Sequence, residues 1–273
     1  MADSLLALSS SYLTMLKILT YNIHKGFSPG NRHFILHKIK SALQSTNADI
    51  IFLQEIQGKH ADNAKNIHNW PDDSQFEFLA DEIWPHHAYG KNAIYSQGHH
   101  GNAILSKMPF SKYENINVSY MKSASRSLLH GVIHPSETRK PLHVICVHLG
   151  LFSFERQRQL IKLVKRIEEF VPHNEPLIIA GDFNDWMGRA EKYLCHELKL
   201  SDAFKSEQGK LARTFPSWMP VLPMDRIYTR GLKITQCQRL HNSHQDYSRE
   251  HSHEHNWTSL SDHLPLLAEF DFK

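Results

Sequence analysis

Cysteine is scarce in this sequence, which holds only Cys146, Cys195 and Cys237 among 273 residues. Their number is odd and they lie far apart, so a disulfide framework is excluded and a reducing compartment is expected. Long apolar runs are also missing, because no window approaches the ~20 residues of a membrane-spanning helix. No Lys or Arg precedes Lys17, which argues against a secretory signal. We therefore expect a cytoplasmic protein.

An excess of charge of one sign is missing as well. Lys and Arg total 31 and Asp and Glu total 28, and the resulting charge of +3 is too small to indicate nucleic acid binding by itself. The chain has no internal repeat and no Gly/Ser-rich linker, so we expect one domain over residues 16–273 after a disordered extension at residues 1–15. One biased segment, the His-rich run 241–255, is more simply explained as an exposed loop than as a metal site.

What the sequence does contain is a series of short apolar segments that alternate with helical patterns. Strands are predicted at residues 16–21, 49–53, 101–105, 113–118, 127–134, 142–148, 176–180, 225–229, 232–237 and 264–272. Helices are predicted at 32–43, 74–84, 155–171 and 189–198. Strands outnumber helices and several helices follow strands, which favours an α/β fold with two packed sheets and helices outside.

Polar side chains that suit metal or phosphate binding stand at the ends of these strands. In the run PLIIAGDFNDW, residues 176–186, a buried strand is followed by Gly181, Asp182 and Asn184. If the chain stays extended past Gly181, Asp182 and Asn184 project to the same side. The other strand ends carry Asn22, Gln54, Glu55, His148, Asp225, Asp262 and His263. Each alone is equally well explained as a turn former, a cap or a core residue, but together they indicate convergence on one rim.

Six short motifs occur in order along the chain: TYN at 20–22, LQE at 53–55, VHL at 147–149, GDFN at 181–184, DRIY at 225–228 and SDH at 261–263. With them the sequence resembles the endonuclease/exonuclease/phosphatase superfamily, most closely an uncharacterised bacterial subgroup. The motifs span residues 20 to 263, so the resemblance covers nearly the whole chain. It implies a four-layer α/β sandwich, in which two mixed β-sheets lie face to face and are flanked by helices.

The resemblance also implies a metal site. Glu55 is the expected ligand of Mg²⁺ or Mn²⁺, and Asn22 and Asp262 are expected to complete or support the site. These are oxygen donors, which suit Mg²⁺ or Mn²⁺ better than a structural zinc.

Catalytic roles follow from the chemistry of phosphodiester hydrolysis, with the family as guide. Asp182 is expected to orient or deprotonate the attacking water, and Asn184 to fix that water or the phosphate. His148 and His263 are expected to donate hydrogen bonds to the phosphate and, as imidazolium ions, to neutralise its charge. Asp225 is expected to pair with His263 and to raise its pKa. Weaker candidates for phosphate or substrate contacts are Arg126, Asn102 and Arg156.

The substrate is the open question, because sandwiches of this kind cleave DNA, RNA, lipid head groups and inositol phosphates. Basic residues are scattered among the expected rim loops, at Lys59, Lys65, Lys91, Lys107, Lys122, Arg126, Arg156 and Arg213. They slightly favour a nuclease-type phosphodiesterase. A phospholipid, sphingolipid or inositol phosphate substrate is the alternative, with the apolar run 218–222 as its only visible contact surface. An inactive binding protein is least favoured, since no motif position is replaced, and a monomer is expected.

Overall fold

Two six-stranded sheets form the centre of this computed structural model, which describes residues 15–95, 98–120, 125–136, 138–241 and 255–272. The first sheet has the order β11 (Leu232–Arg239), β12 (Leu266–Phe272), β1 (Met15–Asn22), β2 (Ile50–His60), β4 (Gly98–Ser106) and β3 (His86–Tyr95). The second has the order β5 (Phe110–Asn117), β6 (Ser127–Ile133), β7 (Leu142–His148), β8 (Leu177–Asp182), β10 (Asp225–Arg230) and β9 (Ser201–Asp202). Each sheet is mixed, because β1 runs parallel to β2 and β7 parallel to β8 while the remaining pairs are antiparallel.

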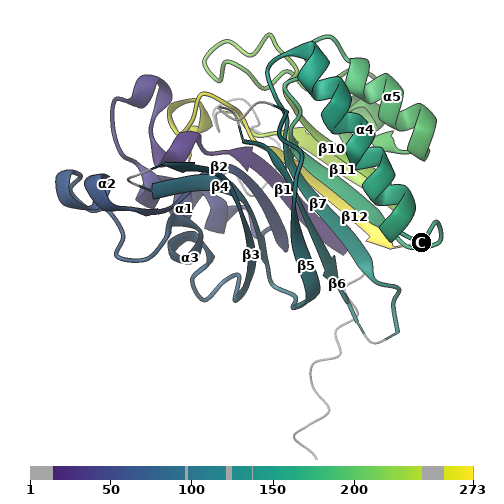
Figure 1. Ribbon diagram of the computed structural model, residues 1–273, viewed down its shortest axis with the longest axis horizontal. Coiled ribbons are helices and arrows are strands. Elements are labelled where there is room, and N and C mark those ends of the chain that lie inside the picture. Colours follow the sequence, from purple (N-terminus) through teal and green to yellow (C-terminus); the bar gives the residue numbers. More distant parts are fainter. Residues whose placement is uncertain (1–14, 96–97, 121–124, 137, 242–254, 273) are drawn as a thin grey trace, which may run out of the picture.

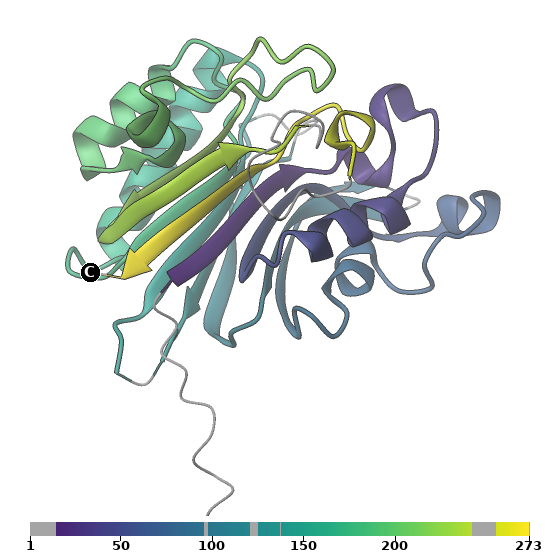
Figure 2. The ribbon, with the colours of Figure 1, turned by 180° about the vertical axis from the view of Figure 1, so that it is seen from behind.

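Helices cover the outer face of each sheet. Figure 1 shows α4 (Ser153–Phe170) and α5 (Arg189–Leu198) outside the second sheet, and α1 (Leu36–Ser45) and α3 (Gln75–Ala80) outside the first. Two further short helices, α2 (Ala61–Asn66) and α6 (Ala203–Gln208), follow β2 and β9. The view from behind shows β11, β12 and β1 side by side (Figure 2). The predicted α/β sandwich with two mixed sheets flanked by helices is confirmed.

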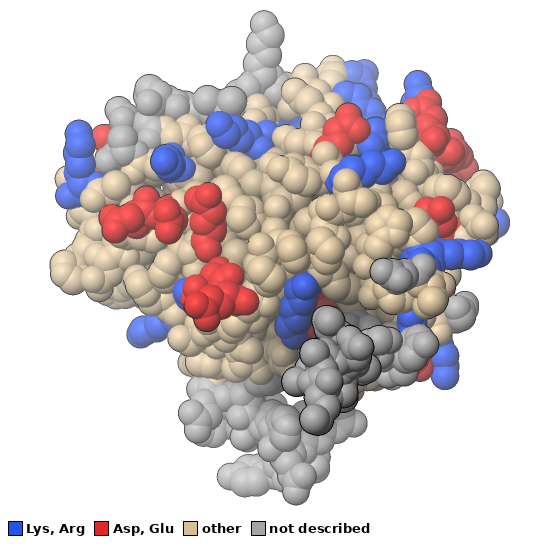
Figure 3. All heavy atoms as spheres, turned by 90° about the horizontal axis from the view of Figure 1, so that it is seen from below, with Lys and Arg blue, Asp and Glu red and all other residues tan. Residues whose placement is uncertain are grey.

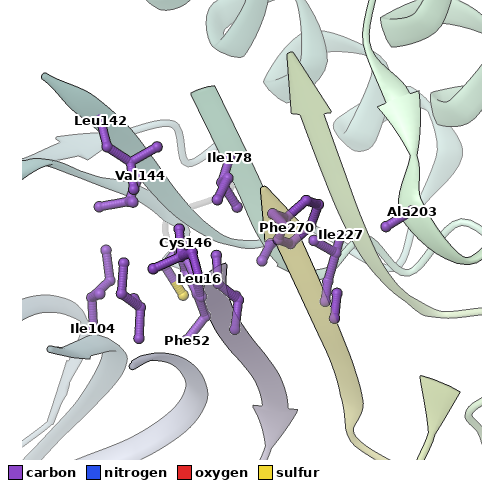
Figure 4. Packing of buried hydrophobic residues seen from close by; sticks show 14 of the residues in the cluster. Leu16, Phe52, Ile104, Leu142, Val144, Cys146, Ile178, Ala203, Ile227 and Phe270 are labelled. Carbon is purple, nitrogen blue, oxygen red and sulfur yellow. The ribbon is translucent and has the colours of Figure 1, made fainter. Parts of the chain in front are cut away.

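The space between the sheets is filled by apolar side chains from both (Figure 4). Leu16 and Phe52 come from the first sheet, and Val144, Cys146 and Ile178 from the second. Two further apolar clusters lie between the sheets and their helices. Leu19 of β1 belongs to the cluster that includes residues of α1, and Leu163 of α4 belongs to the cluster on the second sheet. The alternation within each strand therefore decides which side chains face the other sheet and which face a helix.

Several predicted boundaries were wrong. Residues 49–53 are only the start of β2, which continues to His60 through a bulge that shifts its register with β4 between Leu53 and Ile56. β3 was not predicted, because it is an edge strand whose polar sequence HHAYGKNAIY lacks an apolar run. Residues 1–14 of the expected disordered extension and most of the His-rich run lie outside the described residues, whereas Met15, also assigned to the extension, begins β1. The three cysteines are free, as predicted, and no helix among the described residues is long and apolar enough to cross a membrane.

A buried chain of hydrogen bonds joins the second sheet to α4 away from the predicted site residues. Arg166 Nε donates to His130 Nδ1 over 3.2 Å, His130 Nε2 contacts His143 Nδ1 at 2.9 Å, and His143 Nε2 contacts Glu175 Oε2 at 2.7 Å. Since arginine can only donate, His130 Nδ1 accepts and its Nε2 carries the proton that is donated to His143. His143 then donates to Glu175, so both rings are neutral in this arrangement.

This chain predicts a loss of stability in acid. Burial, assisted by the neighbouring His143 and by the charge of Arg166, lowers the pKa of His130 to about 3. In the unfolded chain His130 takes up a proton near pH ~6.5, whereas in the folded chain the buried ring stays neutral at that pH. The stabilisation is therefore complete above pH ~6.5 and is lost as the pH falls toward about 3. In denaturant unfolding followed by circular dichroism, His130→Gln is expected to flatten the pH dependence of the unfolding free energy, whereas exposed His173→Gln leaves it unchanged.

Candidate active site

The inward-facing side chains of four strands become polar at one edge of the sandwich. In β1 the alternation that buries Leu16 and Ile18 between the sheets places Asn22 on the same face. The same period places His148 after Cys146 in β7, and Asp182 after Ala180 in β8. Asp225 begins β10 and pairs in register with Asp182. The candidate site thus lies at one edge of the interface between the two sheets, where the apolar core gives way to polar side chains.

Asp182 is the centre of this group. Asn22 Nδ2 donates to Asp182 Oδ2 over 3.2 Å, and the backbone N–H of Asn184 donates to Asp182 Oδ1 over 2.9 Å. His148 Nε2 lies 3.6 Å and His263 Nε2 3.8 Å from Asp182 Oδ2. Four predicted residues therefore surround a carboxylate that is 1% exposed.

His263 is held against Asp225 by the loop that precedes β12. Its Nδ1 lies 2.8 Å from Asp225 Oδ2, so the predicted pairing is present. Ser261 anchors this loop, because its hydroxyl donates to the carbonyl oxygen of Asn22 over 2.7 Å. Ligand atoms of Asp182, Asp225 and His263 lie within 4.8 Å of one another, close enough to share an ion. Ser261 was part of the SDH motif but had no predicted role.

The two histidines differ in charge, which the sequence did not predict. Burial lowers the pKa of His263, but the carboxylates of Asp225 and Asp182 outweigh it and raise the value to about 10. Burial lowers the pKa of His148 well below its usual value, assisted by Arg126 and His263. The expectation of an imidazolium at His148 therefore does not hold, and a neutral ring is favoured. Burial also raises the pKa of Asp182 to about 7, against the lowering effect of the His263 charge.

Asn184 does not lie where an extended chain would put it. Its φ is +50°, a left-handed conformation that reverses the backbone after Phe183. Its Nδ2 donates to the carbonyl oxygen of Leu149 over 2.9 Å. One of the two N–H groups of its side-chain amide is therefore already engaged, in a hydrogen bond that joins the GDFN motif to the VHL motif.

Glu55 reaches the edge of the site through the β2 bulge. Alternation from Phe52 turns Gln54 inward and would send Glu55 toward the helices, but the register shift and a φ of +54° at Glu55 break the alternation. Glu55 Oε2 then lies 3.6 Å from Lys25 Nζ and 3.9 Å from His24 Nδ1. His24 Nδ1 is also 3.4 Å from Asp262 Oδ2, so one imidazole ring contacts both predicted carboxylate ligands.

This corner fits a divalent cation. Glu55 Oε2 is shielded from solvent and accepts no hydrogen bond within the described part of the chain, so an electron pair is left for a metal. Glu55 and Asp262 supply the oxygen ligands that Mg²⁺ prefers, and a neighbouring imidazole is also compatible with Mn²⁺. Asn22 is placed differently from the prediction: its Nδ2 donates to Asp182 and its Oδ1 accepts the His24 N–H at 3.1 Å, so both ends are engaged away from Glu55.

His24 and Lys25 are site residues that the sequence did not identify as such. Both have positive φ, +46° and +58°, in the turn that follows β1. Two successive non-glycine residues in this conformation are unusual, and such strain tends to occur at functional sites. The motif TYN marks the strand end, but nothing in the run NIHKGF shows that the turn folds back on Glu55.

The three weaker candidates lie around the centre rather than in it. Arg126 Nε donates to the Leu149 carbonyl oxygen over 3.3 Å, and its charge acts on His148. Asn102 faces the second sheet, where its Nδ2 donates to the Ser127 carbonyl oxygen, while its buried Oδ1 has no hydrogen-bond partner among the described residues. Arg156 is 5% exposed, and its Nη1 donates to the carbonyl oxygens of Gly150 (3.1 Å) and Leu151 (2.5 Å). Arg156 therefore positions the loop after β7, which does not support a direct phosphate contact.

The pairing of Asp225 with His263 predicts the effect of Asp225→Asn. The asparagine keeps the shape but loses the charge that raises the pKa of His263, and the ring is free to adopt the other tautomer. A fall in turnover of roughly 10²-fold is expected, the usual size for an orienting group. The raised pKa adds stability that is complete below pH ~6.5 and lost as the pH rises through about 10. An NMR titration of the metal-free protein that finds the same His263 pKa in both forms would contradict the pairing.

Comparison with known proteins agrees with this geometry. Residues 19–263 match the model of the Endonuclease/Exonuclease/phosphatase family. The uncharacterized protein YbhP of Escherichia coli is 44% identical over 253 residues, which cover 93% of this chain and 95% of that protein.

A Bacteroides vulgatus structure from the same family superimposes with a TM-score of 0.71 at 16% identity, covering 95% of this chain and all of the other. TDP2 of D. rerio, solved with a single-strand DNA product, gives 0.64 at 18% identity, covering 94% and 99%. The fold, the ordered motifs and this family match together show that the chain belongs to the endonuclease/exonuclease/phosphatase family.

Proposed function

We propose that this protein is a divalent-metal-dependent hydrolase of phosphodiester bonds. Members of its family act on phosphoester bonds. The observation that carries the proposal is the placement of Asp182 among Asn22, Asn184, His148 and His263, next to the Glu55–Asp262 corner. A buried carboxylate surrounded by hydrogen-bond donors suits the handling of a water and a phosphate.

Each side chain has a distinct role in this proposal. Asp182 takes the proton of the attacking water or aligns that water, and Asn22 and the Asn184 N–H hold its two oxygens in place. His263, kept protonated by Asp225, donates to a non-bridging phosphate oxygen and neutralises charge there. His148 donates a hydrogen bond as a neutral ring.

A metal would be held by Glu55 and Asp262, with His24 beside them. Mg²⁺ or Mn²⁺ supplies positive charge that stabilises the developing negative charge on the phosphate and the leaving oxygen. In this arrangement Asn22 holds Asp182 and is not a metal ligand. It supports the metal corner only by accepting a hydrogen bond from the backbone N–H of His24.

Nucleic acid as the substrate stays a prediction of the sequence. A second candidate, cleavage of a lipid head group, is favoured by one observation: large apolar side chains are exposed on loops next to the site, among them Phe152 and Trp218.

A substrate and metal screen tests the proposal. The wild type is assayed on single- and double-stranded DNA, RNA, phospholipid vesicles and inositol phosphates, each with Mg²⁺, Mn²⁺ or EDTA. Metal-stimulated release of product from at least one phosphodiester, lost in Asp182→Asn, is expected. Hydrolysis that is equally fast in EDTA, or that is unchanged in Asp182→Asn, would overturn it.

A further inference from the structure

Exposed apolar side chains gather at the edge of the molecule that carries the site. Of the fourteen large apolar side chains that are exposed in the described part of the chain, nine lie at this edge, eight of them on loops and Phe154 in the first turn of α4. The loops follow β5, β7 and β8 or precede β10, and the strand registers place all four at the Asp182 end of the second sheet. Scattered apolar residues are normal on a surface, but a contiguous group marks an interaction site.

These side chains form two lips. The first lip comprises Leu151, Phe152, Phe154, Trp186 and Met187, which are 41–63% exposed, and Tyr120 packs against it. Three of its aromatic rings touch: those of Phe152 and Phe154 are stacked at 5.8 Å, and Tyr120 meets Phe154 edge-on at 5.5 Å. The second lip comprises Trp218, Met219 and Val221, which are 68%, 51% and 45% exposed. It belongs to the light green loop that projects from the upper edge in Figure 1.

Both lips are attached to the candidate site. Arg156 fixes the first lip, because its Nη1 binds the Gly150 and Leu151 carbonyl oxygens and its guanidinium lies 4.7 Å from the Trp186 ring. In the second lip the N–H of Ser217 donates to the Asp262 carbonyl oxygen over 2.7 Å. The apolar tips are thus held at set positions beside Asp182 and Asp262.

The charge around the lips is positive. Within residues 150–162, 185–193 and 212–222, the exposed charged residues are all basic: Arg158, Lys162, Arg189, Lys192 and Arg213. The acidic residues of the same segments, Glu155, Asp185 and Glu191, are buried. The opposite edge differs, since acidic and basic side chains are intermixed on the face seen from below in Figure 3. The site edge therefore combines apolar tips with a basic surround that complements an anionic surface.

We propose that the two lips dock the site edge onto an anionic phospholipid bilayer. Trp and Phe enter the interfacial region, aliphatic tips reach the acyl chains, and the basic residues pair with lipid phosphates. The candidate site then faces the head groups, which deepens the proposed phosphodiesterase function and rests on it for the chemistry, although docking itself needs no turnover.

Two features favour a bilayer over single-stranded nucleic acid as the occupant. Leu151, Met187, Met219 and Val221 are exposed but have no ring on which a base could stack. Two of the basic residues expected to follow a nucleic acid backbone are not available for it: Lys107 pairs with Asp49 at the opposite edge, and Arg156 is engaged by carbonyl groups. Met and aliphatic side chains at loop tips gain most from an apolar phase.

Vesicle co-sedimentation tests the docking. The probes are vesicles of phosphatidylcholine alone and of phosphatidylcholine mixed with phosphatidylglycerol. The wild type is expected to bind the mixed vesicles more tightly, and Phe152→Ser with Trp218→Ser to weaken that binding roughly 100-fold, about tenfold for each lost side chain. The matched control is Phe170→Ser: Phe170 is 48% exposed, like Phe154 at 49%, but lies at the far end of α4, ~25 Å away. This control is expected to bind as the wild type does.

Folding of each variant is checked by its thermal midpoint. A second measurement is quenching of tryptophan fluorescence by brominated phosphatidylcholine. It is expected to report Trp186 and Trp218, because Trp84 and Trp257 are buried and Trp70 is half-buried, with its ring stacked on Phe34. Absence of wild-type binding to mixed vesicles, an equal loss in Phe170→Ser, or binding of a single-stranded oligonucleotide that depends on Trp218 in place of vesicle binding would each overturn the proposal. Asp182→Asn separates the two claims: if it binds vesicles normally while no substrate is cleaved by the wild type, the docking holds and the proposed hydrolysis fails.

Discussion

Replacing Asp182 by asparagine is expected to lower kcat by roughly 10³-fold, within the range found for groups that transfer or align a proton. The side chain is central to the site, because Asn22, Asn184, His148 and His263 all approach its two oxygens. Asparagine keeps the shape but can neither accept a proton nor balance the charge of His263. The folded structure should persist, since the change removes a charge from a position that is 1% exposed.

The matched control for this experiment is Asp202→Asn. Asp202 is also a buried aspartate of the second sheet, 3% exposed, but it pairs with Arg226 at 3.5 Å and lies outside the cluster. Its loss is expected to lower the thermal midpoint and to leave kcat near the wild-type value. Steady-state kinetics on the best substrate of the screen, together with a thermal scan, gives both readouts. A kcat for Asp182→Asn within tenfold of wild type would refute the role of Asp182.

Glu55→Gln is expected to remove metal-stimulated turnover and to weaken Mn²⁺ binding by roughly 10- to 100-fold. The reason is the loss of a charged oxygen ligand at a corner where Lys25 and His24 otherwise oppose a cation. Titration calorimetry of the metal-free protein with Mn²⁺ measures the affinity without any substrate. The thermal midpoint in EDTA should stay close to that of the wild type.

Glu269→Gln is the control for Glu55→Gln. Glu269 lies in the same sheet, its side chain is 20% exposed against 22% for Glu55, and it contacts Lys17 at 3.0 Å. This half-buried pair lies at the opposite end of β1 from Asn22 and makes no contact with Glu55, so metal affinity and turnover should be unchanged. If Glu55→Gln binds Mn²⁺ as the wild type does, Glu55 is not the metal ligand.

The part of the site that was predictable follows from strand alternation. A side chain two residues beyond a buried one stays on the same face, so Asp182 follows Ala180 and His148 follows Cys146. The buried face of α4 and the bounds of α5 were predictable for a similar reason: the helical spacing of their apolar residues shows which face of the helix packs against the sheet. Glu55 was correctly expected at this edge, but from its motif and not from a period.

The failures occur where the backbone leaves the regular geometry. The bulge at Glu55 and the left-handed turn at His24 and Lys25 have no periodic signature, and they decide which side chains meet at the metal corner. Asn184 and Asn22 were assigned by residue type, whereas their hydrogen bonds to Leu149 and Asp182 depend on neighbours far away in sequence. The protonation of His148 differed from the expectation because burial, which no motif reports, outweighs its carboxylate neighbour.

The sequence by itself determined the layered fold, the order of the motifs and the faces on which Asp182, His148 and Asp225 lie, since these depend on local periods and on residue types. Only the tertiary structure decided the contacts. Packing the two sheets brings together Asn22 and Asp182, 160 positions apart, and pairing of β12 with β1 brings Ser261 to Asn22, 239 positions apart. The lips also required the tertiary structure: the apolar run 218–222 was visible in the sequence, but it joins the loops after β5, β7 and β8 at one edge only when the strands between them align. A local pattern specifies the direction of a side chain, whereas its partners are set by contacts between distant segments.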